Sequence, residues 1–168
     1  IKPEQTRQIL KEAFSYQYSY GMAVRGWNPI DNRPYSDSAL WSIYTLDSYI
    51  KETGDREFLF EVIPYSDGGE DTVLKHALCA LDFLENNKGA HGLLLIKFGD
   101  WNDSLTGAGK KGKGESVWLS MAYVYALSKM KKLCKFFGIG DISTELEERE
   151  TLMREKLAAA WEGDRYLR

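Results

Sequence analysis

SVWLSMAYVYALSKMKKLCKFFG, the stretch of residues 116–138, carries the pattern that decides the fold class of this chain. Its apolar side chains recur every three or four residues, the spacing that places them on one side of an α-helix: Met121, Val124, Leu127, Met130 and Leu133. The pattern begins at Ser116 and continues as far as Gly138, a residue type that commonly ends helices. The stretch therefore predicts a long helix with one buried face.

Helical periodicity also dominates the rest of the chain. It predicts four further substantial helices, at residues 3–20, 36–53, 73–89 and 143–161. It also predicts one short helix, at residues 55–62. Residues 93–98 are an apolar run between two glycines that is too short for a helix, so we expect them to be extended. Two long loops remain, at residues 21–35 and 99–114, and the first contains too much glycine and proline for a regular element. We therefore predict an all-α chain with long loops.

Length, charge and cysteine usage restrict the classes of protein to consider. The chain has 168 residues, which suits one domain, and a net charge of −3, which argues against binding to the phosphate backbone of nucleic acids. No apolar run approaches the roughly 18 residues of a membrane-spanning helix, and no signal sequence is found. Cys79 and Cys134 form no C-x-x-C pair and no disulfide framework, so we expect buried thiols and a cytoplasmic location. The first residue is Ile1 rather than Met, which suggests a piece of a longer polypeptide.

The most informative loop reads GDWNDS, at residues 99–104. An indole ring can stack on the C–H face of a sugar while carboxylates bind its hydroxyls, so Trp101 between Asp100 and Asp103 is typical of a sugar site. A carboxyl group held against an indole can also have its pKa raised enough to act as a general acid. The alternative is structural: Asp100 and Asp103 would be turn or cap residues, and Trp101 would fill the core.

Glycines and lysines dominate the rest of this loop. Gly107, Gly109 and Gly112 spell G-x-G-x-x-G, but a dinucleotide-binding turn must follow its strand at once and open a helix. Lys113 is followed by Gly114 rather than by the Ser or Thr that a P-loop needs for magnesium. Nucleotide binding is therefore disfavoured. Two interpretations stay open, a solvated cationic loop and a loop that attracts an anionic substrate.

A second polar and aromatic cluster precedes the helix predicted at residues 36–53: Arg25, Trp27, Asn28, Asp31, Arg33 and Asp37. It is either a surface ion network, in which each pair contributes little, or a clamp on sugar hydroxyls. His76 and His91 are the only histidines, and neither has the spacing of a metal site or of a Ser-His-Asp triad. We expect both to be structural, with no metal and no organic cofactor.

Two motifs, in order along the chain, resemble a known family. The first is SDSALW at residues 36–41, followed by YI at 49–50 and TGD at 53–55. The second is GDWND at residues 99–103, followed by GKGESVWL at 112–119. Together they resemble the inverting glycoside phosphorylases of glycoside hydrolase family 94. That family includes cellobiose and chitobiose phosphorylases, 1,2-β-oligoglucan phosphorylase and the phosphorylase-like region of cyclic β-1,2-glucan synthases.

The resemblance implies an (α/α)6-barrel catalytic domain whose loops form the sugar site at one end. The predicted helices suit about half of such a barrel. The resemblance makes Asp103 the general acid and places Trp101 at the −1 sugar subsite. Arg25 and Asp37 are the nearest candidates for the residues that hold the hydroxyls of that sugar, and Asp100 is a further candidate for substrate binding.

The reaction implied is phosphorolysis of β-linked gluco-oligosaccharides. Inorganic phosphate, the co-substrate, is already a nucleophile, so one carboxylic acid suffices, whereas an inverting hydrolase also needs a base to activate water. Asp103 would protonate the leaving oxygen, and inversion would give an α-sugar 1-phosphate. The implied partners are an oligosaccharide, inorganic phosphate and the rest of the polypeptide, and a homodimer of the intact protein is compatible with them.

Parts of the family pattern are missing from this chain. The family's phosphate-binding histidine and Thr-Gly contacts follow the G-E-S-V-W motif at a distance, and no matching segment is found before Arg168. The N-terminal β-sandwich is absent as well. We therefore expect residues 1–168 to be a fragment of the barrel that has no phosphorolysis activity alone. Two alternatives remain: an (α/α)6 hydrolase or glucan-processing region, and a non-catalytic carbohydrate-binding domain.

Overall fold

The computed structural model describes residues 2–102, 105 and 107–167. The chain divides into two compact units, each with its own core. The first unit comprises Ile1–Pro34 and Ser38–Phe83, and the second comprises Tyr35–Asp37 and Leu84–Arg168.

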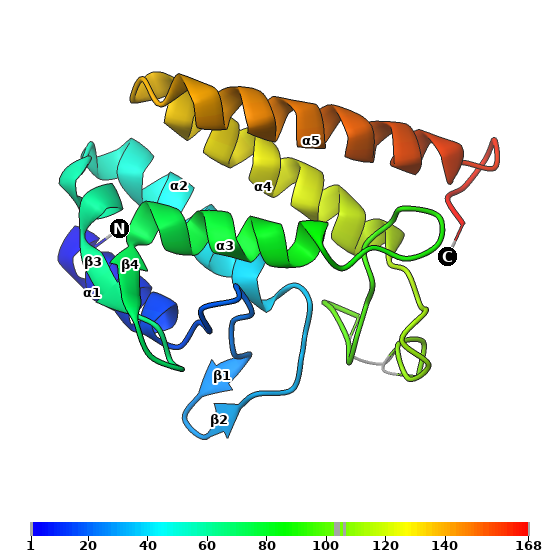
Figure 1. Ribbon diagram of the computed structural model, residues 1–168, viewed down its shortest axis with the longest axis horizontal. Helices are drawn as coiled ribbons and strands as arrows, with labels where there is room; N and C mark the ends of the chain where they lie inside the picture. Colours follow the sequence, from blue (N-terminus) through cyan, green and yellow to red (C-terminus); the bar gives the residue numbers. More distant parts are fainter. Residues whose placement is uncertain (1, 103–104, 106, 168) are drawn as a thin grey trace. The chain divides into compact units, whose positions relative to one another are not determined.

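Helices make up most of the regular structure in the described residues (Figure 1). In chain order the elements are α1 (Pro3–Ser15), β1 (Gly26–Trp27), β2 (Ile30–Asp31), α2 (Ser38–Thr53), the 3-10 helix η1 (Glu57–Phe60), β3 (Val62–Pro64), β4 (Glu70–Thr72), α3 (Val73–Glu85), α4 (Val117–Phe136) and α5 (Gly140–Ala159). The predicted helix-rich character is confirmed. The strictly all-α prediction needs a correction, because the chain also forms two small antiparallel sheets.

The first unit is built on α1 and α2, which pack against each other (Figure 1). Both helices bury apolar side chains at helical spacing: Leu10 and Phe14 on α1, and Leu40, Ile43, Leu46 and Ile50 on α2. Burying one such side chain contributes about 1.5–3 kcal/mol. Pro3 suits the first turn of α1, because its ring presets φ where no N–H is needed.

Helix α1 ends at Ser15, short of the end predicted near residue 20. The cause is the buried side chain of Gln17, whose amide donates to the carbonyl oxygens of Gly21 at 3.1 Å and His76 at 2.9 Å. Gly21 has a φ of 99°, and a Cβ there would lie 2.0 Å from the carbonyl oxygen of Cys79. The chain therefore folds back in a tight turn instead of continuing the helix.

The two sheets lie where the sequence predicts a loop or a helix. Strands β1 and β2 fall within residues 21–35, predicted to hold no regular element, and pair with Gly26 opposite Asp31. Strand β3 replaces the end of the helix predicted at residues 55–62, of which only η1 is helical. It pairs with β4 in antiparallel fashion, with Ile63 opposite Asp71. Strands of two or three residues are too short to show an alternating pattern.

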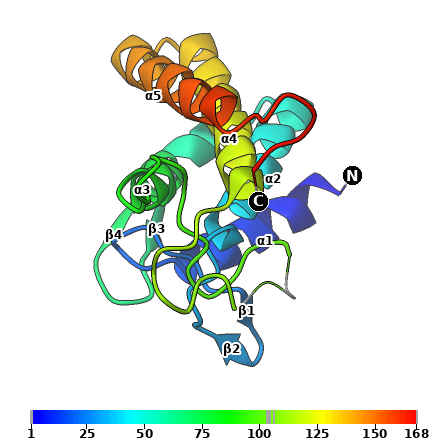
Figure 2. The ribbon, with the colours of Figure 1, turned by 90° about the vertical axis from the view of Figure 1, so that its right-hand side faces the viewer.

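In the second unit, α4 and α5 are joined by a short turn at Gly138 and pack side by side (Figure 2). The predicted apolar face of α5 is confirmed, since Leu146, Met153 and Leu157 are buried. On α4 the buried apolar residues are Leu119, Tyr123, Val124, Ala126, Leu127, Met130, Leu133 and Cys134. Met121 was expected among them but is exposed. Apolar residues surround much of α4, so periodicity alone does not identify every buried position.

Neither cysteine forms a disulfide. Cys134 is buried as predicted, and burial raises the pKa of its thiol to about 11. Cys79 is only partly buried, so the prediction of two buried thiols is wrong for this residue. In the part of the chain that the structure describes, no helix has the length and apolar character needed to cross a membrane.

Candidate functional site

The predicted site residue Asp37 lies on a short segment that pairs with the chain just before the D-W-N-D loop. The backbone N–H of Ser36 donates to the carbonyl oxygen of Gly99 at 3.0 Å. The Ser36 hydroxyl donates to the carbonyl oxygen of Leu95 at 2.9 Å. Asp37 and Asp100 each directly follow a residue of the Ser36–Gly99 pair. The structure therefore brings these two buried carboxylates into one part of the second unit.

The apolar run at residues 93–98 forms no helix, as predicted, and it pairs with other segments only at single positions. Its isolated pairings are Leu94 with Lys88, Leu95 with Glu115, and Lys97 with Tyr35. Lys97 has a φ of 53°, in the left-handed region that is unfavourable for a residue with a side chain. Strained residues of this kind cluster at functional sites. This one lies shortly before Asp100.

The Asp100 side chain is 1% exposed, and both of its carboxylate oxygens accept hydrogen bonds. Oδ2 accepts from the hydroxyl of Ser116 at 2.5 Å, and Oδ1 accepts from the backbone N–H of Asn102 at 2.9 Å. Short bonds from a hydroxyl to a carboxylate belong to the stronger class of hydrogen bonds. Sequence reasoning did not single out Ser116 as a site residue, because no local pattern pairs it with Asp100. Its only signal was its position at the start of the helix in the G-E-S-V-W motif.

The ring of Trp101 is 64% exposed on its loop. The alternative in which Trp101 fills the core is therefore excluded. An exposed indole beside polar groups is the arrangement that stacking on a sugar requires. That role stays a prediction, and the predicted general acid Asp103 lies outside the described residues.

Two glycines of the loop at residues 99–114 allow close packing of the backbone, a role that is unrelated to nucleotide binding. A Cβ on Gly109 would lie 1.4 Å from the carbonyl oxygen of Lys97. A Cβ on Gly114 would lie 2.2 Å from the carbonyl oxygen of Ala108. These close approaches allow the loop to fold back onto the apolar run. Its lysines are exposed, as a solvated cationic loop predicts: Lys110, Lys111 and Lys113. Attraction of an anionic substrate stays a prediction.

The cluster before α2 contains a surface ion pair in the first unit. Nε and Nη2 of Arg33 donate to the two carboxylate oxygens of Asp31, at 2.8 and 2.6 Å. Hydrogen bonding from Arg33 is the main reason that the pKa of Asp31 falls to about 2. This part of the cluster is therefore the ion network that the sequence left open. Arg25, predicted to hold sugar hydroxyls, is exposed in the first unit, whereas Asp37 belongs to the second, and the role of Arg25 stays a prediction.

His76 is a buried structural residue, as predicted. Its Nδ1 lies 2.8 Å from Oε1 of Gln17, and its Nε2 lies 2.9 Å from the carbonyl oxygen of Ile63. The ring stacks on Tyr65 with centroids 3.9 Å apart. Burial is the main cause that lowers the pKa of His76 below its usual value. Across the described ranges, no group of three or more His, Cys, Asp or Glu side chains is arranged to hold a metal ion.

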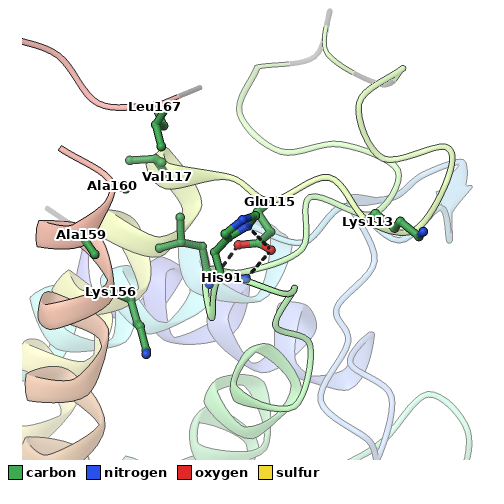
Figure 3. Close-up of a pocket in the computed structure, with 9 residues that line it drawn as sticks. His91, Lys113, Glu115, Val117, Lys156, Ala159, Ala160 and Leu167 are labelled. Atoms are coloured by element: carbon green, nitrogen blue, oxygen red, sulfur yellow. Dashed lines mark hydrogen bonds and ion pairs between the residues drawn. The ribbon is translucent and has the colours of Figure 1, made fainter. Parts of the chain in front are cut away.

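A cavity of about 480 Å³ lies in the second unit, between the start of α4 and the end of α5 (Figure 3). Much of its wall is apolar: Leu93, Val117, Ala159, Ala160 and Leu167. The Glu115 carboxylate accepts from the backbone N–H of His91 at 3.0 Å and of Leu93 at 3.2 Å. Figure 3 shows the ends of Lys113 and Lys156 pointing away from this carboxylate. The Glu115 carboxylate therefore holds the turn before the apolar run.

A profile of the catalytic domain of the glycosyl hydrolase 94 superfamily matches residues 1–168. The chain is 43% identical to solabiose phosphorylase of Paenibacillus borealis over 167 residues, which cover 98% of this chain and 22% of that protein. It is 33% identical to 3-O-beta-D-glucopyranosyl-beta-D-glucuronide phosphorylase of the same organism over 158 residues, covering 86% of this chain and 20% of that protein.

A third relative is a glucan synthase. The chain is 26% identical over 190 residues to the cyclic beta-(1,2)-glucan synthase NdvB of Rhizobium meliloti (strain 1021), covering 99% of this chain and 7% of that protein. The chain spans about a fifth of the length of the two phosphorylases. The resemblance expected from the motifs at residues 36–41 and 99–103 is confirmed, and the chain belongs to the catalytic domain of the glycosyl hydrolase 94 superfamily.

Proposed function

We propose that this chain is part of an inverting glycoside phosphorylase that cleaves β-linked gluco-oligosaccharides with inorganic phosphate. The observation that carries the proposal is the match of residues 1–168 to the family's catalytic domain, together with the two phosphorylases among its relatives. The exposure of Trp101, which directly follows the carboxylate of Asp100 in the chain, supports a sugar site in the second unit.

Asp103 is the general acid in the proposed reaction. Its carboxylic proton passes to the glycosidic oxygen as the bond between that oxygen and the anomeric carbon breaks. A phosphate oxygen bonds to the anomeric carbon from the opposite face, so a β-glucoside gives an α-sugar 1-phosphate. Because phosphate is itself the nucleophile, the reaction needs no second carboxylate to activate water. The proposal includes no metal and no organic cofactor.

Three further residues have substrate-binding roles in this proposal. The indole face of Trp101 would contact the C–H face of the sugar in the −1 subsite. The carboxylate of Asp37 and the guanidinium of Arg25 would bind the hydroxyls of that sugar. The pairing of the neighbouring Ser36 with Gly99 supports the role of Asp37. The role of Arg25 rests on the sequence motif.

The proposal extends to the architecture of the whole protein. The helices of this chain would form about half of an (α/α)6 barrel, and other parts of the polypeptide would supply the phosphate site and an N-terminal β-sandwich. The 168 residues alone would then lack phosphorolysis activity. The support is that the chain spans about a fifth of two related phosphorylases. A cytoplasmic location and a homodimer of the intact protein belong to the same proposal.

The test of the acid is Asp103→Asn in the full-length protein. We expect formation of α-sugar 1-phosphate to fall by about 100-fold or more, because a general acid contributes on that order. The circular dichroism spectrum and the free energy of unfolding should stay unchanged. Asp141→Asn, which alters an exposed carboxylate on α5, is the matched control and should retain the wild-type rate. Phosphate-dependent turnover retained by Asp103→Asn would contradict the assignment.

The similarity to a cyclic glucan synthase favours one second candidate, a hydrolytic or glucan-processing region without phosphorolysis. Turnover measured with and without inorganic phosphate separates the two, and equal rates would favour hydrolysis. The same variants identify a non-catalytic sugar-binding domain. In that case oligosaccharide binding would survive Asp103→Asn and be lost in Trp101→Ala, with no bond cleavage in the wild-type protein.

A further inference from the structure

Asp100 is tied to the first turn of α4 by a hydroxyl that makes two hydrogen bonds. Ser116 is the N-cap of α4, and its Oγ accepts from the backbone N–H of Leu119 at 3.0 Å. The same hydroxyl donates its hydrogen to Oδ2 of Asp100 at 2.5 Å. A hydroxyl offers one donor and two acceptor positions, so both bonds form together. One side chain thus begins a helix and holds a buried carboxylate.

Ser116 is itself fixed by its surroundings. Its backbone N–H donates to the carbonyl oxygen of Leu94 at 2.8 Å. Its carbonyl oxygen accepts from the hydroxyl of Ser120 at 2.8 Å, and that hydroxyl accepts in turn from the backbone N–H of Leu94 at 2.9 Å. These bonds close a ring between the apolar run and the first turn of α4. Such an anchor has the rigidity that positioning a functional loop requires.

The other carboxylate oxygen of Asp100 holds the loop. Oδ1 accepts from the backbone N–H of Asn102 at 2.9 Å, so the carboxylate spans the backbone on both sides of Trp101. The residue after Asn102 is Asp103. Because Asp100 is 1% exposed and both of its oxygens accept bonds from within the chain, it is poorly placed to bind a sugar hydroxyl.

We infer that Asp100 is a positioning residue: anchored by Ser116, it holds the backbone on both sides of Trp101 in place for the reaction. The inference rests on the proposed function, because it gives Asp100 a part in the same phosphorolysis. It replaces the direct substrate contact that the motif predicts for Asp100. A displacement of about 1 Å at a reacting group can lower the rate by about 100-fold, so the effect of this anchor is measurable.

Hydrogen exchange tests the anchor directly in the full-length protein. Ser116→Gly removes the hydroxyl but keeps most of the capping, because glycine is tolerated at an N-cap. We expect exchange in a peptide covering residues 99–105 to speed up at least about tenfold, since the carboxylate loses its anchor and the Asn102 N–H loses a fixed acceptor. Ser116→Thr keeps a hydroxyl and should restore slow exchange.

Ser143→Gly is the matched control for this measurement. Ser143 is also a serine of the second unit that is 8% exposed, it lies in the first turn of α5, and its hydroxyl donates to the carbonyl oxygen of Lys131 at 3.3 Å. The substitution removes an equally buried hydroxyl near the start of another helix. It should therefore lower the stability of the protein without speeding exchange at residues 99–105.

Kinetic measurements then show whether the hydrogen bond from Ser116 to Asp100 contributes to the rate of phosphorolysis. Values of kcat and KM for phosphorolysis are compared in Asp100→Asn, Ser116→Gly and the double variant. If Asp100 acts through Ser116, each single change lowers kcat by about 10- to 100-fold, and the double variant is no slower than the slower single variant. Ser116→Thr should recover most of kcat, and Ser143→Gly should keep it.

Three results would each overturn the inference. Unchanged exchange at residues 99–105 in Ser116→Gly would show that the hydroxyl does not hold the loop. Independent, multiplying losses of kcat in the two single variants, or a rise in KM alone in Asp100→Asn, would show that Asp100 contacts the substrate. The exchange measurement needs no turnover, so a failure of the proposed phosphorolysis would appear separately, in the kinetics of Asp103→Asn.

Discussion

Gln17 and His76 are joined twice inside the first unit. The side-chain amide of Gln17 donates to the carbonyl oxygen of His76 at 2.9 Å, and its Oε1 lies 2.8 Å from Nδ1 of the same residue. Both residues are buried, and they lie 59 positions apart in the chain. The pair therefore connects the turn after α1 to the first turn of α3, and it accounts for the early end of α1.

Loss of the Gln17 amide should destabilise the first unit. Gln17→Met keeps the length of the side chain but leaves the carbonyl oxygen of Gly21 and the ring of His76 without this partner. We expect the free energy of unfolding to fall by about 1–3 kcal/mol, the range for a buried polar group left unsatisfied. Urea denaturation followed by circular dichroism measures it. Gln8→Met, on the exposed side of α1, should change stability by less than about 0.5 kcal/mol. Equal effects of the two substitutions would contradict the prediction.

The buried ring of His76 also makes stability depend on pH. Burial lowers its pKa from the ordinary 6.5, while the bond to Ile63 and the charge of Asp71 oppose the change more weakly. The unfolded chain thus takes up a proton near pH 6.5, whereas the folded chain does so only at lower pH. The contribution to stability is fully present above that pH and is lost as the pH falls through the lower folded pKa.

The measurement is the free energy of unfolding of the wild type and of His76→Gln between about pH 7.5 and pH 5. The advantage of the wild type should shrink as the pH falls, because only the wild type carries the buried ring. If the free energy of unfolding of His76→Gln changed with pH as steeply as that of the wild type, His76 would not be the source of this pH dependence.

Alanine substitutions at Gly21 and Gly54 distinguish the energetic cost of steric crowding from the cost of an unfavourable backbone conformation. Both have positive φ, 99° and 69°, so each disfavours a side chain. A Cβ on Gly54 meets nothing within 4 Å, whereas a Cβ on Gly21 would lie 2.0 Å from the carbonyl oxygen of Cys79. Gly54→Ala should therefore cost about 1–2 kcal/mol of unfolding free energy, and Gly21→Ala at least about 2 kcal/mol more. Similar thermal unfolding midpoints for the two variants would show that crowding at Gly21 is relieved.

Gly109 and Gly107 make a similar pair in the loop of the second unit. A Cβ on Gly109 would collide with the carbonyl oxygen of Lys97, whereas one on Gly107 meets nothing within 4 Å. Gly109→Ala should displace the loop, lower the free energy of unfolding by about 2 kcal/mol or more, and reduce sugar 1-phosphate formation. Gly107→Ala should stay within about 0.5 kcal/mol of the wild type and keep its activity. If Gly109→Ala were as stable as the wild type, the close approach of Gly109 to the carbonyl oxygen of Lys97 would be ruled out.

Local patterns predicted the features that depend on neighbours in the chain. The buried face of α5 followed from the spacing of Leu146, Met153 and Leu157, and the non-helical run at 93–98 from its length and its flanking glycines. The residue types around Trp101 indicated sugar chemistry, and the family match confirmed the motif that they belong to. Periodicity and composition are local properties, so a single sequence is enough to detect them.

Distant contacts set the features that local patterns missed. Helix α1 stops where it does because Gln17 bonds to a carbonyl group 59 positions away. Asp100 is a buried anchor because folding brings it to Ser116, sixteen positions later. No spacing rule connects either pair, since each arises when separate segments pack together. The amino-acid sequence thus predicted most of the helices and the residue types of the loop, whereas packing between segments assigned the buried carboxylate of Asp100 its surroundings.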